Sequence, residues 1–193
     1  MYLAHNNPAM VSPLPDNVEQ CKGIVSCVGD DAFMLSDGTE IERIEVLVFC
    51  TGYEYDMSFM SEKVPLRLRD RQIQPLYKHL VHTGFPTLAV IGVPIRIVPF
   101  PFFDVQIRYY CSYLAGKFSL PSNMDAIITS EKARRKATEG IGEKHFHKFG
   151  GYQWGYLKDL AKESGVAPLP PHYEDLYELV WNRKDGHCQH IKT

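Results

Sequence analysis

The chain has 193 residues, of which 45% are hydrophobic and 23% are charged, and its formal net charge is −2. This length is enough for one domain and part of another, and the composition excludes wholesale disorder and a collagen-like chain. Proteins that bind nucleic acid through phosphate contacts usually carry a surplus of Lys and Arg. This chain has 21 basic and 23 acidic residues, so no nucleic-acid partner is expected.

The sequence contains five cysteines: Cys21, Cys27, Cys50, Cys111 and Cys188. Because the number is odd and no two are spaced C-x-x-C, the sequence predicts neither a disulfide scaffold nor a structural zinc site, and it favours a reducing compartment. The longest apolar runs, residues 46–50 and 88–93, are far too short to cross a bilayer. The first ten residues lack the basic and apolar regions of a signal peptide. We expect a location in the cytoplasm or at the periphery of the endoplasmic reticulum, with no membrane anchor in this chain.

The first part of the chain predicts short strands. Residues 18–28 form a strand candidate, and residues 32–36 form its return strand. Asp37-Gly38 is a strong hairpin signal, because glycine accepts the positive φ that such turns require. Residues 39–44 then continue this small sheet.

Two further apolar runs predict buried strands, residues 45–50 (EVLVFC) and residues 86–92 (PTLAVIG). Prolines follow the second run, and Pro101 suits the first turn of a helix because its missing N–H would be unpaired there. We predict a helix from about Pro101 to Leu114. Apolar side chains nearly surround this helix, so we expect it to be buried on all sides.

The last seventy residues predict three helices, over residues 124–138, 152–163 and 173–181. Four side chains of the second helix share one apolar face: Tyr156, Leu157, Leu160 and Ala161. The third helix follows the i, i+3, i+4, i+7 pattern of an amphipathic helix. Composition therefore indicates a β-rich part up to about Tyr53 and an α-rich part after it.

Motifs for phosphate and metal binding are missing from the sequence. No G-x-G-x-x-G motif occurs, so the chain offers no glycine loop for a dinucleotide pyrophosphate. His145 and His147 would point to opposite faces of a strand or helix, and the group His187, Cys188 and His190 lies in a polar tail, so we expect no metal site. Cys50 is interpreted as a small core residue, because no cationic neighbour would activate its thiol.

One string carries a specific signal. Residues 46–56 (VLVFCTGYEYD) place an apolar strand directly before a small polar turn, and this resembles the strand and A-T-G-Y motif of flavin-containing monooxygenases. Cys50 replaces the usual alanine of that motif, a form similar to that of the insect members. Further landmarks follow the family's order: Asp37-Gly38, P-L-Y-K-H at 75–79, P-T-L-A-V-I-G at 86–92, F-D-V-Q-I-R at 103–108 and L-P-S at 120–122. In the fourth of these, Asp104 replaces the usual glutamate.

The resemblance implies an α/β fold that is part of a flavoprotein with two dinucleotide-binding domains, one for FAD and one for NADP. It covers only the family's C-terminal portion. Residues 1–53 would end the NADPH-binding domain and include the crossover motif, and residues 54–193 would form the C-terminal portion of the FAD-binding domain.

The resemblance also implies an activity. Family members use NADPH and FAD to oxygenate soft nitrogen or sulfur centres of small molecules through a C4a-hydroperoxyflavin, as in N,N-dimethylaniline monooxygenase. The cofactor-binding residues expected here are Thr51, Gly52, Tyr53, Gly92, Phe103, Gln106 and Arg108; no catalytic residue is assigned.

Physical roles follow for two parts of this set. Gly92 would permit close backbone approach to the flavin. The helix after Pro101 would aim its N-terminal amides at the pyrimidine edge, where the reduced flavin gathers negative charge. The alternative for Gln106 and Arg108 is ordinary hydrogen bonding on the helix surface.

Alternative functions stay open. The chain could be a truncated, non-catalytic remnant or interaction partner, because both phosphate-binding loops are missing and the isolated chain is expected to be inactive. A Baeyer–Villiger-type flavin monooxygenase shares part of the pattern, whereas a disulfide reductase is disfavoured by the absence of C-x-x-C. A homo-oligomer is also left open, and no motif identifies the substrate.

Overall fold

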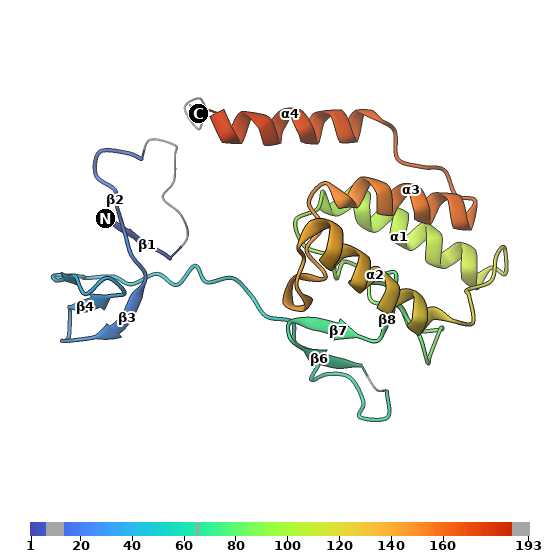
Figure 1. Ribbon diagram of the computed structural model, residues 1–193, viewed down its shortest axis with the longest axis horizontal. Helices are drawn as coiled ribbons and strands as arrows, with labels where there is room; N and C mark the ends of the chain where they lie inside the picture. Colours follow the sequence, from blue (N-terminus) through green and yellow to red (C-terminus); the bar gives the residue numbers. More distant parts are fainter. Residues whose placement is uncertain (7–13, 65, 187–193) are drawn as a thin grey trace. The chain divides into compact units, whose positions relative to one another are not determined.

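The computed structural model describes residues 1–6, 14–64 and 66–186 (Figure 1). The chain divides into two compact units, one formed by Met1–Gly52 with the chain from Glu178 onward, and the other by Tyr53–Tyr177. The assignment of residues 1–53 and 54–193 to NADPH- and FAD-binding domains stays a prediction. The group His187, Cys188 and His190 lies outside the described residues.

The first unit contains two small sheets. Strand β1 (Tyr2–Ala4) pairs in parallel with β2 (Glu19–Cys21), and β3 (Ile24–Cys27), β4 (Phe33–Leu35) and β5 (Glu40–Ile41) form an antiparallel sheet in that order. The predicted hairpin at Asp37-Gly38 is confirmed, with Gly38 at φ +86°. The single strand predicted over residues 18–28 is instead split, because its two halves pair with different strands.

The buried strand predicted over residues 45–50 is wrong. This stretch has no strand hydrogen bonding, and the side chains of Val46, Val48 and Phe49 are 75%, 72% and 77% exposed. An apolar strand forms only where neighbours pair its backbone and cover its side chains. No described segment does so here.

The buried strand predicted over residues 86–92 is also wrong. Only Ala89 makes a β-bridge, with Val81, and the run ends in a turn at Ile91 and Gly92. Its residues from Leu88 to Val90 are half-buried. The hydrophobic composition marked a segment that packs against the core and makes two backbone hydrogen bonds beside this bridge, from His82 to Leu88 and from Val90 to Leu80, but no longer ladder.

The second unit begins with two hairpins and continues as helices. Strand β6 (Arg67–Arg69) pairs with β7 (Gln72–Gln74), and β8 (Leu76–Tyr77) pairs with β9 (Val81–His82). The helical elements are α1 (Pro99–Leu114), α2 (Met124–Glu139), the 3₁₀ turn η1 (Glu143–His145), α3 (Tyr152–Ser164) and α4 (His172–Gly186). All four predicted helices are therefore confirmed, with α4 extending further than its apolar pattern.

Helices α1 and α3 lie side by side in Figure 1 and share the main core of this unit. The buried face predicted for α3 is confirmed by Tyr156, Leu157, Leu160 and Ala161. The expectation that α1 is buried on all sides is wrong. Its buried residues are Phe102, Val105, Gln106, Tyr109 and Ser112, which follow one helical face. No helix in the described part of the chain is both long and apolar enough to cross a membrane.

Candidate functional site

Residues 91–93 form a turn, called here the Gly92 turn, that is held from several sides. Gly92 adopts φ +80°, and its N–H donates to Oε1 of Gln106 at 3.0 Å. The next carbonyl, of Val93, accepts a hydrogen bond from the hydroxyl of Tyr55 at 2.5 Å. A Cβ built on Gly92 would lie only 2.9 Å from Cε1 of Phe103. Glycine is therefore required both by the backbone conformation and by the ring beside it.

We expect Gly92→Ala to lower the free energy of unfolding by about 2–3 kcal/mol, because a left-handed L-residue costs about 1–2 kcal/mol and displacing a packed ring adds about 1 kcal/mol. The matched control is Gly116→Ala, since Gly116 has a similar φ of +70° with nothing within 4 Å of its Cβ position. Urea unfolding of both variants separates the two costs. Equal losses in the two variants would show that Phe103 does not constrain position 92.

Gln106 connects the Gly92 turn to helix α3. Its amide nitrogen donates to the hydroxyl of Tyr156 at 2.9 Å, and that hydroxyl donates to the carbonyl of Lys78 at 2.8 Å. Gln106 and Tyr156 are buried. The sequence-based alternative of surface hydrogen bonding is therefore wrong for Gln106.

This series of hydrogen bonds ends at an unusual turn in the P-L-Y-K-H segment, residues 75–79. Lys78 and His79 both adopt positive φ, at 48° and 53°. The ammonium group of Lys78 lies 3.0 Å from the carboxylate of Glu163 on α3, which also accepts hydrogen bonds from the hydroxyls of Tyr77 and Tyr109. Burial and this carboxylate raise the pKa of both tyrosines. Their hydroxyls therefore act here as hydrogen-bond donors.

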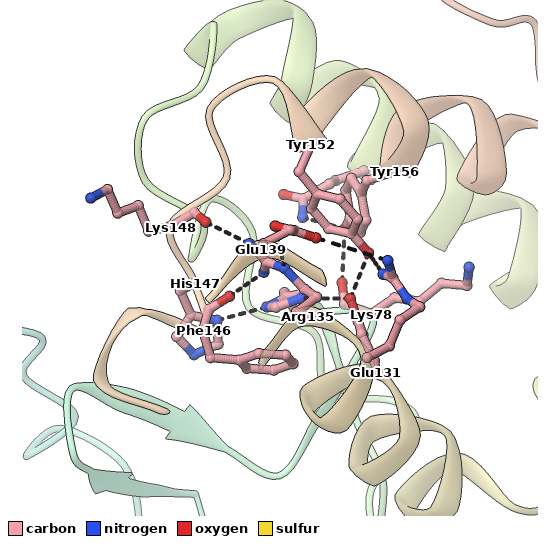
Figure 2. Close-up of polar contacts among 12 residues, drawn as sticks. Lys78, Glu131, Arg135, Glu139, Phe146, His147, Lys148, Tyr152 and Tyr156 are labelled. Atoms are coloured by element: carbon pink, nitrogen blue, oxygen red, sulfur yellow. Dashed lines mark hydrogen bonds and ion pairs between the residues drawn. The ribbon is translucent and has the colours of Figure 1, made fainter. Parts of the chain in front are cut away.

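A second polar cluster lies between α2 and the segment that follows η1 (Figure 2). The guanidinium of Arg135 is fully buried and donates to the carbonyls of Phe146 and Lys148 at 2.6 and 2.7 Å. It also lies 3.3 Å from the carboxylate of Glu139 and 4.3 Å above the ring of Tyr152. This one side chain fixes the course of residues 146–148.

His147 and His79 continue this cluster as a pair of buried imidazoles. Nε2 of His147 accepts the N–H of Ile73 at 3.1 Å, so in the neutral ring Nδ1 carries the proton and donates to Nδ1 of His79 at 2.8 Å. His79 then holds its proton on Nε2, which lies 3.3 Å from the carboxylate of Glu131. Burial lowers the pKa of both histidines, that of His147 to about 3. The hydrogen bonds from His79 and Tyr152 outweigh desolvation and lower the pKa of Glu131 to about 2. The bonding pattern therefore determines one tautomer for each ring.

The structure brings together three of the residues expected from the resemblance, namely Gly92, Phe103 and Gln106. Arg108 is elsewhere: it pairs with Asp104 at 2.8 Å and donates to the carbonyl of Ala167, so for Arg108 the surface interpretation holds. The binding of a cofactor by any of these residues stays a prediction.

Thr51, Gly52 and Tyr53 are exposed and lie in an irregular stretch, at the border of the two units. Sequence reasoning missed Tyr55, which follows them and reaches the Gly92 turn. The alternation of tyrosines in T-G-Y-E-Y was the available signal. It also missed Tyr156, which was interpreted only as an apolar helix-face residue.

The start of α1 offers few free amides. The helix begins at Pro99, and Pro99 and Pro101 have no N–H. The N–H of Phe102 already donates to the carbonyl of Val98. Phe100 therefore carries the one N–H group among the first three helical positions, and the expectation that the start of this helix faces a flavin stays a prediction. Within residues 1–6, 14–64 and 66–186, no three His, Cys, Asp or Glu side chains are grouped to hold a metal ion.

Comparison with known proteins decides the family. The family model described as "Flavin-binding monooxygenase-like" matches residues 9–188. The chain belongs to this family. This confirms the resemblance given by the T-G-Y motif and its ordered landmarks.

Two curated relatives come from Arabidopsis thaliana. "Flavin-containing monooxygenase FMO GS-OX-like 7" is 32% identical over 181 residues, which are 91% of this chain and 39% of the relative. "Flavin-containing monooxygenase FMO GS-OX-like 4" is 26% identical over 166 residues, which are 85% of this chain and 37% of the relative. The chain thus spans about two fifths of the length of these relatives.

Solved structures agree on the fold. S-allyl-L-cysteine S-oxygenase from Allium sativum superposes with a TM-score of 0.76 at 28% identity, covering 95% of this chain and 42% of the neighbour. Tmm from Pelagibacter superposes with a TM-score of 0.74 at 21% identity, covering 94% and 40%, and supports the fold alone. The α/β flavoprotein fold class expected from the sequence is confirmed.

Proposed function

We propose that this chain is the C-terminal part of an FAD- and NADPH-dependent monooxygenase that transfers oxygen to a soft nitrogen or sulfur centre of a small molecule. The observation that carries the proposal is the family match over residues 9–188, together with a fold shared with an S-oxygenase. FAD, when bound, supplies the activation of oxygen, and the protein supplies orientation and exclusion of water. The finer flavin chemistry that the resemblance implies belongs to this proposal.

We infer that the Gly92 turn would lie against one edge of a bound flavin. The N–H of Gly92 already donates to Gln106, and the ring of Phe103 occupies the space where a Cβ would lie. A ligand would therefore contact the side of the turn that faces away from these two side chains. Ile91 within the turn and Ile95 and Phe100, which follow it in the chain, have exposed apolar side chains. Such a surface can cover a flat aromatic ring and exclude water from it.

The pyrophosphate of either cofactor needs a different part of the protein. No glycine-rich loop of the G-x-G-x-x-G type occurs in these 193 residues, and relatives of this family are more than twice as long. We propose that the remaining part of a longer polypeptide binds the phosphates and covers the exposed apolar run at residues 46–49.

The size and flavin content of the native protein test this proposal. An antibody against residues 173–193 is expected to detect a band at more than twice 22.1 kDa, and the protein it captures is expected to contain FAD and to oxidise NADPH when a thioether is present. S-allyl-L-cysteine is the first substrate to try, because a structural neighbour is named for its oxygenation. A band near 22 kDa alone, without flavin, would contradict the proposal and favour the non-catalytic remnant.

The same captured protein distinguishes the second flavin-dependent activity. A Baeyer–Villiger enzyme inserts oxygen beside a ketone carbonyl, whereas the proposed enzyme oxidises the sulfur of a thioether. Parallel assays with a cyclic ketone and a thioether, each followed by NADPH consumption and product mass, decide between the two.

A further inference from the structure

Three hydrogen bonds in series join the Gly92 turn to the Lys78–His79 turn across helices α1 and α3. The N–H of Gly92 donates to Gln106, the amide nitrogen of Gln106 donates to Tyr156, and the hydroxyl of Tyr156 donates to the carbonyl of Lys78. A backbone N–H can only donate and a backbone carbonyl can only accept. The two ends therefore determine the orientation of the Gln106 amide and the direction of the Tyr156 hydroxyl.

Water cannot reach the middle of this series to replace a lost hydrogen-bond partner. Gln106 is 0% exposed and Tyr156 is 4% exposed. The ring of Tyr156 stacks on Phe102 at 5.2 Å with an angle of 10°, and Phe149 packs edge-on at 5.0 Å. Its hydroxyl is thus held in one place, and removing it leaves the Gln106 amide and the Lys78 carbonyl each without a partner.

The far end of the series is anchored on two helices. Lys78 pairs with Glu163 of α3 at 3.0 Å, and the adjoining His79 lies 3.3 Å from Glu131 of α2. The backbone between them is in the left-handed region, where non-glycine residues persist only under surrounding support. The carbonyl that accepts from Tyr156 is therefore a fixed point, from which the series positions the N–H of Gly92.

We propose that Tyr156 is a positioning residue that sets the orientation of the Gly92 peptide through Gln106, and thereby the surface that the Gly92 turn presents to the flavin. The inference rests on the proposed function for its second half only. Tyr156 itself does not touch the proposed cofactor surface. It acts through one intermediate side chain, and its effect is expected to be specific to the Gly92 turn.

Tyr109 supplies a matched control on the adjacent helix. It is a buried tyrosine of the same core, and its hydroxyl makes one hydrogen bond, to Glu163 at 2.9 Å, where that of Tyr156 makes two, with Gln106 and Lys78. It is not a member of the series. Tyr156→Phe and Tyr109→Phe therefore remove the same atom from the same core, and only the first interrupts the connection to Gly92.

Amide hydrogen exchange in the 193-residue chain tests the first half. Tyr156→Phe is expected to accelerate exchange of the Gly92 N–H about tenfold, the change that corresponds to one lost hydrogen bond, while Tyr109→Phe leaves it unchanged. Gln106→Met removes the acceptor directly and is expected to match Tyr156→Phe. If Gln106→Met accelerates exchange and Tyr156→Phe does not, Tyr156 has no positioning role and the inference is overturned. Equal acceleration in both tyrosine variants would overturn it as well, since it would reflect general loosening of the core.

The absorption spectrum of flavin bound to the longer protein that the antibody captures tests the second half of the proposal. Tyr156→Phe is expected to shift the visible absorption of bound flavin, and Tyr109→Phe is expected to leave it as in the wild type. An unshifted spectrum in Tyr156→Phe, with flavin bound, would overturn the link between the Gly92 turn and the cofactor. If the intact protein contains no flavin at all, the proposed function fails, and the exchange rates alone then decide the role of Tyr156 in holding the turn.

Discussion

Replacing Arg135 by alanine is expected to lower the free energy of unfolding by about 3–5 kcal/mol, because it leaves buried acceptors without a donor and opens a cavity. Its guanidinium donates to the carbonyls of Phe146 and Lys148, and these are the residues that flank His147 (Figure 2). The same segment pairs with Ile95, whose N–H donates to the carbonyl of His147 at 2.9 Å. The loss of stability is therefore expected to include residues 94–98, which connect the Gly92 turn to α1. Urea unfolding followed by tryptophan fluorescence measures it.

Arg134 provides the control at the neighbouring position. Its side chain is half exposed, lies 3.8 Å from the carboxylate of Glu139 and donates to the hydroxyl of Tyr152 at 3.1 Å. Exposed ion pairs contribute about 0–1 kcal/mol, so Arg134→Ala is expected to lose no more than that. Similar losses in both variants would contradict the role given to burial. Arg135→Lys is expected to fall between them, because an ammonium group keeps the charge but cannot reproduce the planar fork that reaches both carbonyls.

The helices and the Asp37-Gly38 hairpin could be predicted because their signals are local. In α3 the spacing of Tyr156, Leu157 and Leu160 alone indicates which face is buried, whatever packs against it. At Gly38 the positive φ is a property of one residue type. Such features follow from neighbours in the sequence and need no knowledge of the rest of the fold.

Strands could not be predicted in this way, because a strand forms only when another segment pairs with its backbone. Residues 45–50 have the composition of a buried strand, yet the described residues supply no neighbour and their side chains stay exposed. Residues 86–92 pack against the core but make only one bridge, at Ala89. A hydrophobic run predicts that a segment packs against something apolar, whereas strand pairing depends on segments far away in the sequence.

The candidate site shows the same division. Three residues of the family landmarks, Gly92, Phe103 and Gln106, lie within 15 residues of one another in the sequence, and the structure brings them into contact. Gln106 on α1 was open to a surface interpretation, since a glutamine in a helix carries no sign of burial. Its partner Tyr156 is 50 residues away in the sequence, and no local pattern indicates a buried hydrogen bond across that separation.

The His79–His147 pair was equally hidden in the sequence. The sequence indicates only that His147 and His145 point to opposite faces, and the structure shows His147 buried in the core. Its partner lies 68 residues earlier, in the P-L-Y-K-H segment that the resemblance used only as a landmark. That landmark is explained by contacts: Tyr77, Lys78 and His79 are each held by a carboxylate of α2 or α3.

Acid is expected to destabilise the chain through this pair, by about 3 kcal/mol between pH 7 and pH 4 from His147 alone. The pKa of His147 is lowered to about 3 in the folded chain, whereas an unfolded histidine has a pKa near 6.5. The unfolded state therefore binds the extra proton first, and stability falls by about 1.4 kcal/mol per pH unit from pH 6.5 down toward pH 3. Burial lowers the pKa of His79 as well, so it acts in the same direction. The carboxylate of Glu131, with a pKa of about 2, loses its contribution only as the pH falls from about 4.5.

His147→Gln separates this pair from the other titrating groups. Glutamine can accept the N–H of Ile73 and donate to His79, but it cannot take up a proton, so the variant is expected to be less stable than the wild type at pH 7 and equal to it or more stable at pH 4. The groups that face the pair from the packed elements are Glu131, Lys132 and Arg135, and both cations oppose a positive imidazolium. Parallel slopes for wild type and His147→Gln would show that the buried pair does not govern acid unfolding. If the curves of stability against pH for wild type and His147→Gln cross, the neutral imidazole pair stabilises the fold at pH 7 and its protonation destabilises the fold in acid.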